Sequence, residues 1–158
     1  MLVVGAFDDA GNATIRIRIG GPLAIQSYIA IIDTGFSGFI AMPQVEMVPL
    51  GLATQYAAAA VMLGNGEIIY NLVALGHVTI GGRTVAGPIL LDETTNDVLV
   101  GMAFLRAFKL ALILTDTAVV LHDKEETWEA VAQFMQTAPA GLPNASPATS
   151  TSRGADNE

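Results

Sequence analysis

The triplet Asp33-Thr34-Gly35 directly follows the apolar run Ile29–Ile32, and this arrangement limits the folds open to the chain. The uncharged, mostly β-branched residues before the triplet predict a buried strand that delivers a carboxylate into a tight turn. Two carboxylates held close together can share one proton and activate a water molecule, because like charges at that distance cannot both ionise. The 158 residues contain a single such triplet, so the pattern implies a second carboxylate from a second subunit.

An aspartate after a strand can also be a plain turn residue whose side chain accepts backbone N–H groups. We favour this interpretation for Asp116, because Asp116-Thr117-Ala118 imitates the triplet but lies in the turn of an expected hairpin. Asp33 differs from Asp116, because it ends an uncharged strand and the loop after it leads into another apolar stretch. The sequence therefore favours a catalytic role for Asp33.

Composition narrows the possible functions. The chain is 52% hydrophobic, which predicts one compact domain with apolar surface left over for association with another protein chain. The net charge of -8 and the lack of a basic patch argue against nucleic acid as a partner. The absence of cysteine excludes disulfides and thiol chemistry, and His77 and His122 lack the spacing of metal ligands. We expect neither a metal nor another cofactor.

The sequence also bears on localisation. The segment Met1–Gly5 has no basic residues, and Asp8 follows too soon for a secretion signal. The longest uncharged stretch, residues 47–66, is interrupted by Pro49 and Gly51 and is expected to form loop and strand. We therefore expect a cytoplasmic protein without a membrane span.

Most of the chain has the alternation or the turn residues of β-structure. Residues 13–19 alternate strictly between isoleucine and polar side chains, which predicts a half-buried strand. Asn65-Gly66 between two apolar runs is a strong hairpin signal, since both residues tolerate positive φ. The other expected strands cover residues 23–32, 56–63, 67–75, 78–80, 84–91, 98–100, 110–114 and 118–121.

Two helices are expected among these strands and after them. A short helix should span residues 102–108, and a second should begin after Asp123, where Asp123 and Glu126 form a capping box. Trp128, Val131, Ala132 and Met135 fall on one face of this second helix and should cover the β domain. The expected division is a domain over 1–123, the amphipathic helix over 124–138 and a disordered tail over 139–158.

With these elements placed, the chain resembles the retropepsin-like aspartic proteases of clan AA. The similarity is greatest to small single-domain prokaryotic members, whose active-site loop reads Asp-Thr-Gly-Phe-x-Gly-Phe. Here that loop is Asp33–Phe39, and Met42-Pro43 follows it as in those relatives. The family's later hydrophobic-hydrophobic-Gly motif matches Leu99-Val100-Gly101, and its flap corresponds to Val61–Glu67.

The resemblance implies an all-β fold: a small closed β-barrel with a flap hairpin, one short helix and a C-terminal helix. It also implies a homodimeric aspartic endopeptidase that hydrolyses a polypeptide substrate with water activated by two Asp33 carboxylates. Thr34 would hydrogen-bond across the interface, and Gly35 would permit close approach of backbone N–H groups. The flap would close over an extended peptide. The residues expected to contact that peptide are Phe36, Phe39, Ile40, Leu63, Gly64, Asn65 and Gly66.

The chain departs from retroviral members of the family at two positions. Phe36 replaces a small residue after the triplet, and Met102 replaces the arginine that braces the retroviral dimer. Two other functions therefore stay open. One is a non-catalytic dimerisation or peptide-binding module on the same fold. The other is a protease that cuts only its own tail, between Trp128 and Glu158.

Overall fold

The computed structural model describes residues 1–54, 57–62 and 68–137. Its strands are β1 (Leu2–Phe7), β2 (Ala13–Gly20), β3 (Ile25–Ile32), β4 (Ile40–Met42), β5 (Ala57–Met62), β6 (Ile68–Ile80), β7 (Arg83–Leu91), β8 (Val98–Val100), β9 (Leu110–Leu114) and β10 (Val119–Asp123). Its helices are α1 (Gln44–Leu50), the 3-10 turn η1 (Leu52–Thr54), α2 (Met102–Ala107) and α3 (Lys124–Thr137).

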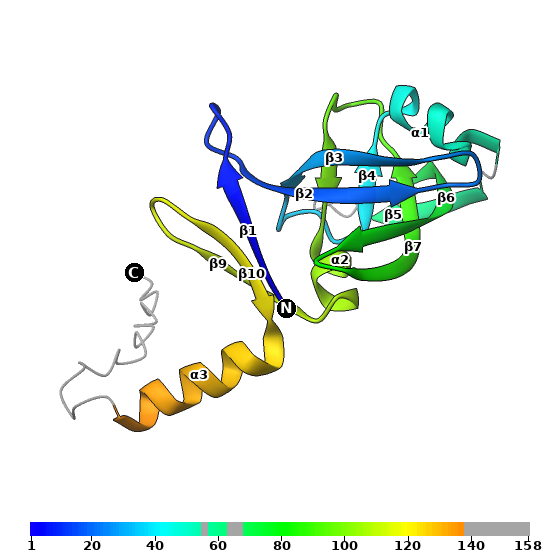
Figure 1. Ribbon diagram of the computed structural model, residues 1–158. Helices are drawn as coiled ribbons and strands as arrows, with labels where there is room; N and C mark the ends of the chain where they lie inside the picture. The colour runs from blue at the N-terminus through cyan, green and yellow to red at the C-terminus, as the bar shows by residue number, and fades with distance from the viewer. Residues whose placement is uncertain (55–56, 63–67, 138–158) are drawn as a thin grey trace, which may run out of the picture.

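Six of the strands close into a barrel (Figure 1). Around the barrel their order is β2, β3, β8, β4, β7 and β6, and β6 pairs again with β2. β3 runs parallel to β8, and β4 runs parallel to β7; the other neighbours in the ring are antiparallel. The expected all-β fold with a small closed barrel is confirmed.

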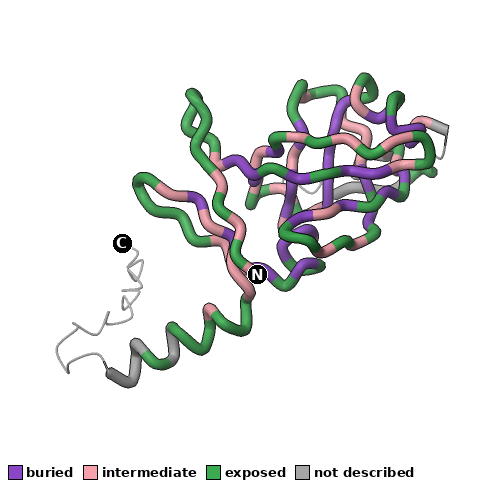
Figure 2. The backbone as a smooth tube through the Cα atoms, in the orientation of Figure 1, coloured by how far each residue is buried: buried purple, intermediate pink, exposed green. Residues whose placement is uncertain are grey.

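Strand β2 shows why this sequence forms a barrel wall. Ile15, Ile17 and Ile19 are at most 1% exposed, whereas Arg16 and Arg18 between them point to solvent. Burial of each isoleucine side chain contributes about 1.5–3 kcal/mol, and a slip of one residue would bury the arginines in their place. The alternation therefore fixes the register of β2, and the buried strands enclose a common core (Figure 2).

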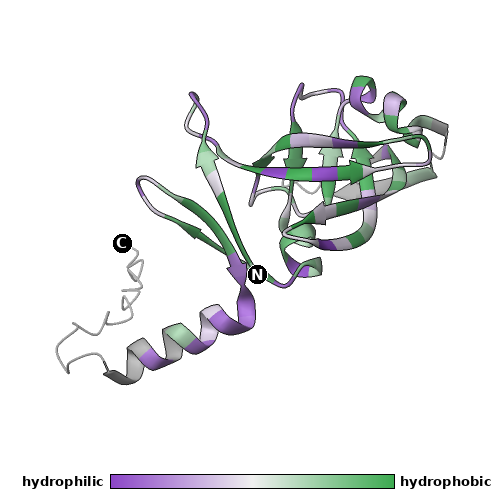
Figure 3. Ribbon diagram, in the orientation of Figure 1, coloured by the Kyte–Doolittle hydropathy of each residue, from purple (hydrophilic) through white to green (hydrophobic). Residues whose placement is uncertain are grey.

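Strand β1 joins the barrel to a second, three-stranded sheet. Its first half, Leu2–Gly5, pairs with β10, while Ala6 and Phe7 pair with β2. A Cβ on Gly5 would lie 2.1 Å from the carbonyl oxygen of Thr14, so only glycine fits where β1 passes the barrel. β9 forms the outer edge of this sheet, which projects from the barrel and is largely apolar (Figure 3).

The sequence did not predict several features of this architecture, the short strand β4 among them. It gave no strand for β1, because Leu2 and Val4 are exposed and the usual alternation of buried apolar and exposed polar residues is missing. α1 lies in a stretch that we expected to be loop and strand, and it buries Met47 and Leu50. The separate strands expected at 67–75 and 78–80 are one continuous strand, β6.

Helix α3 begins where the capping box was expected, but its contacts differ from a capping box. The Asp123 carboxylate accepts the N–H of Glu125 at 3.1 Å, and this hydrogen bond lowers the pKa of Asp123. Glu126 does not reach back to the start of the helix; its carboxylate lies 3.2 Å from Nε2 of His122. Thr127 donates to the carbonyl of Asp123 at 2.9 Å and lies 2.8 Å from Nδ1 of His122. β10 and the first turn of α3 are thereby fixed to each other.

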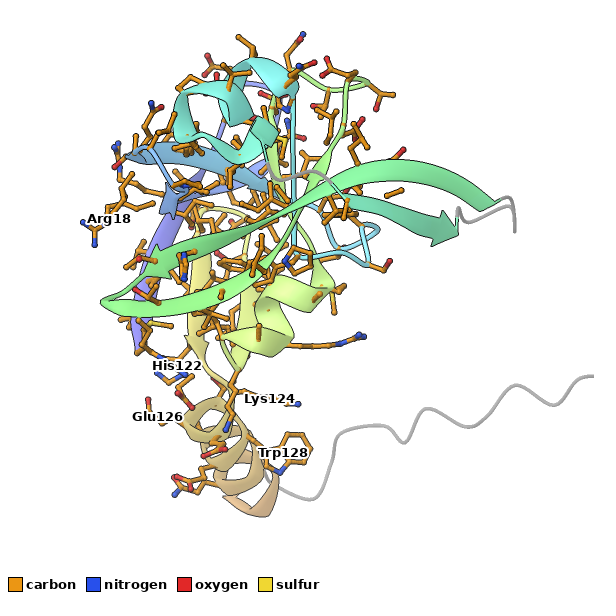
Figure 4. The ribbon with its side chains drawn as sticks, turned by 90° about the vertical axis from the view of Figure 1, so that its right-hand side faces the viewer. Arg18, His122, Lys124, Glu126 and Trp128 are labelled. Atoms are coloured by element: carbon orange, nitrogen blue, oxygen red, sulfur yellow. The ribbon has the colours of Figure 1, made fainter. Side chains whose placement is uncertain are left out.

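The expectation that Trp128 covers the barrel is wrong. Trp128 is 71% exposed, and α3 leads away from the barrel (Figures 1 and 4). The side chains of Val131, Ala132 and Met135, the flap turn at 63–67 and the predicted tail lie outside the described residues. The division at 123 and 138 therefore stays a prediction. None of the described helices combines the length and the apolar character needed to cross a bilayer.

The residue after α2 generates a stability prediction. Lys109 has φ of 55°, the one positive φ of a non-glycine residue in the described chain, and its N–H bonds to the carbonyl of Arg106 at the helix end. Glycine is the residue best suited to this left-handed position. We expect Lys109→Gly to be more stable than Lys109→Ala by about 1 kcal/mol, measured by thermal unfolding. Equal stability of the two variants would contradict a left-handed backbone conformation at residue 109.

Candidate active site

The loop after β3 holds Asp33 through backbone hydrogen bonds. The N–H of Asp33 donates to the carbonyl of Val100 at 2.9 Å, which ties the residue to the end of β8. Its Oδ1 atom accepts the N–H of Gly35 at 2.8 Å and the N–H of Phe36 at 3.2 Å. Within the described chain Oδ2 has no hydrogen bond, so one carboxylate oxygen is oriented and the other is left for a further partner.

The tip of the loop faces solvent. Thr34 and Gly35 are exposed, and Asp33 beside them is half-buried. The Thr34 hydroxyl makes no hydrogen bond to any described residue. A Cβ on Gly35 would lie 3.2 Å from Oδ1 of Asp33, so a side chain there would press on the carboxylate. The bond that we expected Thr34 to make across an interface stays a prediction.

A second segment crosses this loop directly behind the carboxylate. The carbonyl of Phe36 accepts the N–H of Met102 at 2.8 Å, and the carbonyl of Gly38 accepts the N–H of Ala103 at 3.0 Å. A Cβ on Gly101 would lie 2.4 Å from both of these carbonyl oxygens. Gly101 is therefore the residue that permits the crossing. In the sequence, Gly101 was recognised only as the glycine of the motif Leu99-Val100-Gly101, and its role in the crossing was not predicted.

Two residues that we expected to contact substrate lie in the core. Phe39 is 3% exposed and Ile40 is fully buried, so neither side chain reaches the surface of the protomer. The Phe39 ring packs against those of Phe104 and Phe108, with centroids at 5.7 and 6.4 Å. These buried aromatic residues support the loop from the core side. Phe36 is half-buried beside Gly38 and stays close to the loop surface.

The other predicted substrate contacts, Leu63, Gly64, Asn65 and Gly66, lie outside the described residues. The two strands of their hairpin are described, and β5 pairs antiparallel with β6 from Ala57 to Met62. Asp116 lies in the exposed turn between β9 and β10, where the N–H of Thr115 donates to the carbonyl of Ala118 at 3.0 Å. Within the ranges that the structure describes, no three His, Asp or Glu residues gather as metal ligands.

A cleft of about 1110 Å³, which was not predicted from the sequence, lies next to the loop. It is bounded by α2, β9 and α3, and Thr34 lies on its rim. Its residues come from these three elements, from Lys109 between α2 and β9, and from the loop after β3, so only the fold brings them together. They are Thr34, Met102, Leu105, Arg106, Lys109, Leu110, Ala111, Leu112, Lys124, Glu125, Trp128 and Glu129.

The comparisons with known proteins now bear on the fold. No family model and no curated protein matches the chain. Among solved structures, it is similar to the crystal structure of a retropepsin-like aspartic protease from Rickettsia conorii. The two are 21% identical, with a TM-score of 0.54, over 77% of this chain and 89% of that chain. The fold is retropepsin-like. At 21% identity this likeness concerns the fold alone, and the chemistry of the loop depends on its own residues.

Gly101 provides a test of the crossing. We expect Gly101→Ala to destabilise the retropepsin-like domain by roughly 3 kcal/mol, because the new Cβ would collide with two backbone carbonyls that cannot move independently. The measurement is urea unfolding. Gly20→Ala is the matched control: its Cβ would lie 3.2 Å from the side chain of Ile25, which can turn toward solvent, and at an ordinary contact distance of 3.8 Å from the carbonyl oxygen of His77. Similar losses in both variants would contradict the role of Gly101.

Proposed function

We propose that this protein is an aspartic endopeptidase that acts as a homodimer. One observation carries the proposal. In a retropepsin-like fold, a carboxylate at the end of a barrel strand is oriented by two backbone N–H groups and keeps one free oxygen. A turn aspartate can accept the same N–H groups. The crossing at Gly101, which fixes the loop from behind, favours a site over a simple turn.

The chemistry needs two carboxylates in different protonation states. The ionised Asp33 of one subunit takes a proton from water while the protonated Asp33 of the other donates a hydrogen bond to the scissile carbonyl. Attack by the water oxygen gives a tetrahedral intermediate. Breakage of its C–N bond, with a proton transferred to the leaving nitrogen, yields a carboxylic acid and an amine. No metal or cofactor takes part.

The second carboxylate comes from a second copy of the chain. A single Asp-Thr-Gly triplet occurs in the sequence, and Thr34 and Gly35 are exposed at the loop tip, where a partner can approach. The Thr34 hydroxyl, which bonds to none of the described residues, is the group that would bond to the partner's loop. Phe36 and the flap residues 63–66 are the proposed contacts for an extended peptide.

Replacement of Asp33 tests the proposed reaction. We expect Asp33→Asn to lower the rate of peptide cleavage by at least about 100-fold, because an amide can neither accept the proton of water nor share one with its partner. The assay is digestion of an unfolded protein mixture from acid to neutral pH. Asp116→Asn is the control, since Asp116 lies in an exposed turn, and it should cleave at the wild-type rate.

The outcomes separate the possible functions. Equal cleavage by wild type and Asp33→Asn would contradict the proposal. Binding of extended peptide without turnover by either protein would identify a non-catalytic module on this fold. Loss of mass from the C-terminus of wild type alone, with no digestion of other proteins, would identify a protease restricted to its own tail.

Mixing the two proteins tests whether the dyad is shared between subunits. A mixed dimer contains one carboxylate and one amide, so excess Asp33→Asn should inhibit the wild-type protein in proportion to the mixed dimers formed. The measurement is cleavage rate against the ratio of variant to wild type after the subunits have exchanged. Unchanged cleavage at a large excess of variant would show that one subunit suffices.

A further inference from the structure

The cleft beside the active-site loop has an apolar floor and an exposed aromatic residue at its edge. Leu105 and Leu110 line it and are only 5% and 6% exposed, and Met102 and Leu112 are partly buried beside them. Trp128 contributes to the rim from α3 and is 71% exposed. Figure 4 shows its ring standing out from the helix. Large aromatic side chains exposed beside an apolar cleft are typical anchors of protein interfaces.

The two walls of the cleft carry opposite charges. Arg106 and Lys109 line it on the side of α2, whereas Glu125 and Glu129 line it on the side of α3 and outweigh the one lysine there, Lys124. All five side chains are exposed. None of them is in an ion pair with another described residue, since the ion pairs of that part of the chain are Arg83–Asp123 and His122–Glu126. A surface with both signs of charge on facing walls can complement itself.

The third wall of the cleft is β9, an edge strand. β9 pairs with β10 on one side only, and no other described strand lies along its second edge. All five of its residues are apolar, and Ile113 and Leu114 are exposed at its far end. An exposed apolar edge of this kind favours association with another chain.

We propose that a second copy of this chain docks in this cleft, with α3 of each copy lying against α2 and β9 of the other. The inference rests on the proposed function, which requires the loop at Thr34 to meet its counterpart. Because Thr34 also forms the rim of the cleft, a subunit that reaches Thr34 adjoins the cleft as well.

A two-fold axis explains the charges. Such an axis brings the acidic wall of each copy, Glu125 and Glu129, opposite the basic wall of the other, Arg106 and Lys109. The same contact covers the apolar floor twice and buries both Trp128 rings. In this dimer α3 and its tryptophan pack against the other subunit and so hold the second Asp33 in place. This contact accounts for a helix that does not pack against its own barrel.

The only tryptophan of the chain provides a direct test on the unmodified protein. Full-length protein is diluted through the range where sedimentation shows dimer passing to monomer, and acrylamide quenching of tryptophan fluorescence is measured at each concentration. We expect a several-fold lower quenching constant and bluer emission in the dimer. Dimers whose tryptophan is quenched as strongly as in the monomer would overturn the proposal. Protection that does not change on dilution would show that the chain covers its own cleft, which also overturns it.

A pair of variants tests the contact itself. Trp128→Ala should raise the dimer dissociation constant on the order of tenfold or more, with unchanged circular dichroism, because the side chain is largely exposed in one protomer. Ile25→Ala is the matched control, since Ile25 is 70% exposed on β3 and lies outside the cleft. Equal dissociation constants for Trp128→Ala and the wild-type protein would overturn the proposal.

A charge exchange adds an independent measurement. Arg106→Glu and Glu129→Arg should each weaken the dimer, and the double variant should recover much of the loss, because the two side chains face each other across the axis. Simple addition of the two losses would overturn the pairing. These results separate from those for Asp33→Asn. A dimer protected at Trp128 but without cleavage would refute the peptidase, whereas a cleaving dimer with Trp128 accessible would refute only the docking site.

Discussion

The hydrogen bonds between the loop after β3 and the segment after β8 are the interaction on which the site depends. They join backbone to backbone, from Asp33 to Val100 and from Met102 and Ala103 back to Phe36 and Gly38. They require glycine at position 101, because the carbonyl oxygens of Phe36 and Gly38 lie so close to Gly101 that a Cβ there would not fit. The position of the Asp33 carboxylate thus follows from two barrel strands and one glycine, and the Phe39, Phe104 and Phe108 rings support the crossing from the core.

Much of the barrel was predictable because its strands carry a simple pattern. The alternation in β2 reflects a wall with one buried face, and the hairpin of β5 and β6 has its own turn signal. The uncharged run before Asp33 does form a strand, but the expectation that it is buried is only partly right, because Ile29 is 54% exposed. β6 was predicted as two strands, at 67–75 and 78–80, with Gly76 between them. In the folded chain Gly76 is a point of close packing, where a Cβ would lie 2.4 Å from Ile89.

The site was predictable only in part. The triplet itself identifies Asp33, but the backbone donors that orient its carboxylate belong to no side-chain pattern. Phe39 and Ile40 were assigned to a substrate surface because they are apolar and close to Asp33 in sequence, whereas the turn of the loop sends both into the core. Closeness to Asp33 in the sequence does not indicate whether a side chain points toward the site or into the core. For the same reason the cleft at Thr34, built from α2, β9 and α3, could not be foreseen.

The pairing of β1 with β10 has a consequence for how the chain folds. The strands that close the barrel all lie between Ala13 and Val100, so a nascent chain can complete them before β10 has been synthesised. β1 cannot acquire its main partner until β10 emerges, because Leu2 pairs with His122. Contacts between such distant parts of a chain form slowly. The apolar strand β1 is therefore exposed to misassembly during synthesis, and the sheet that carries α3 forms after the barrel.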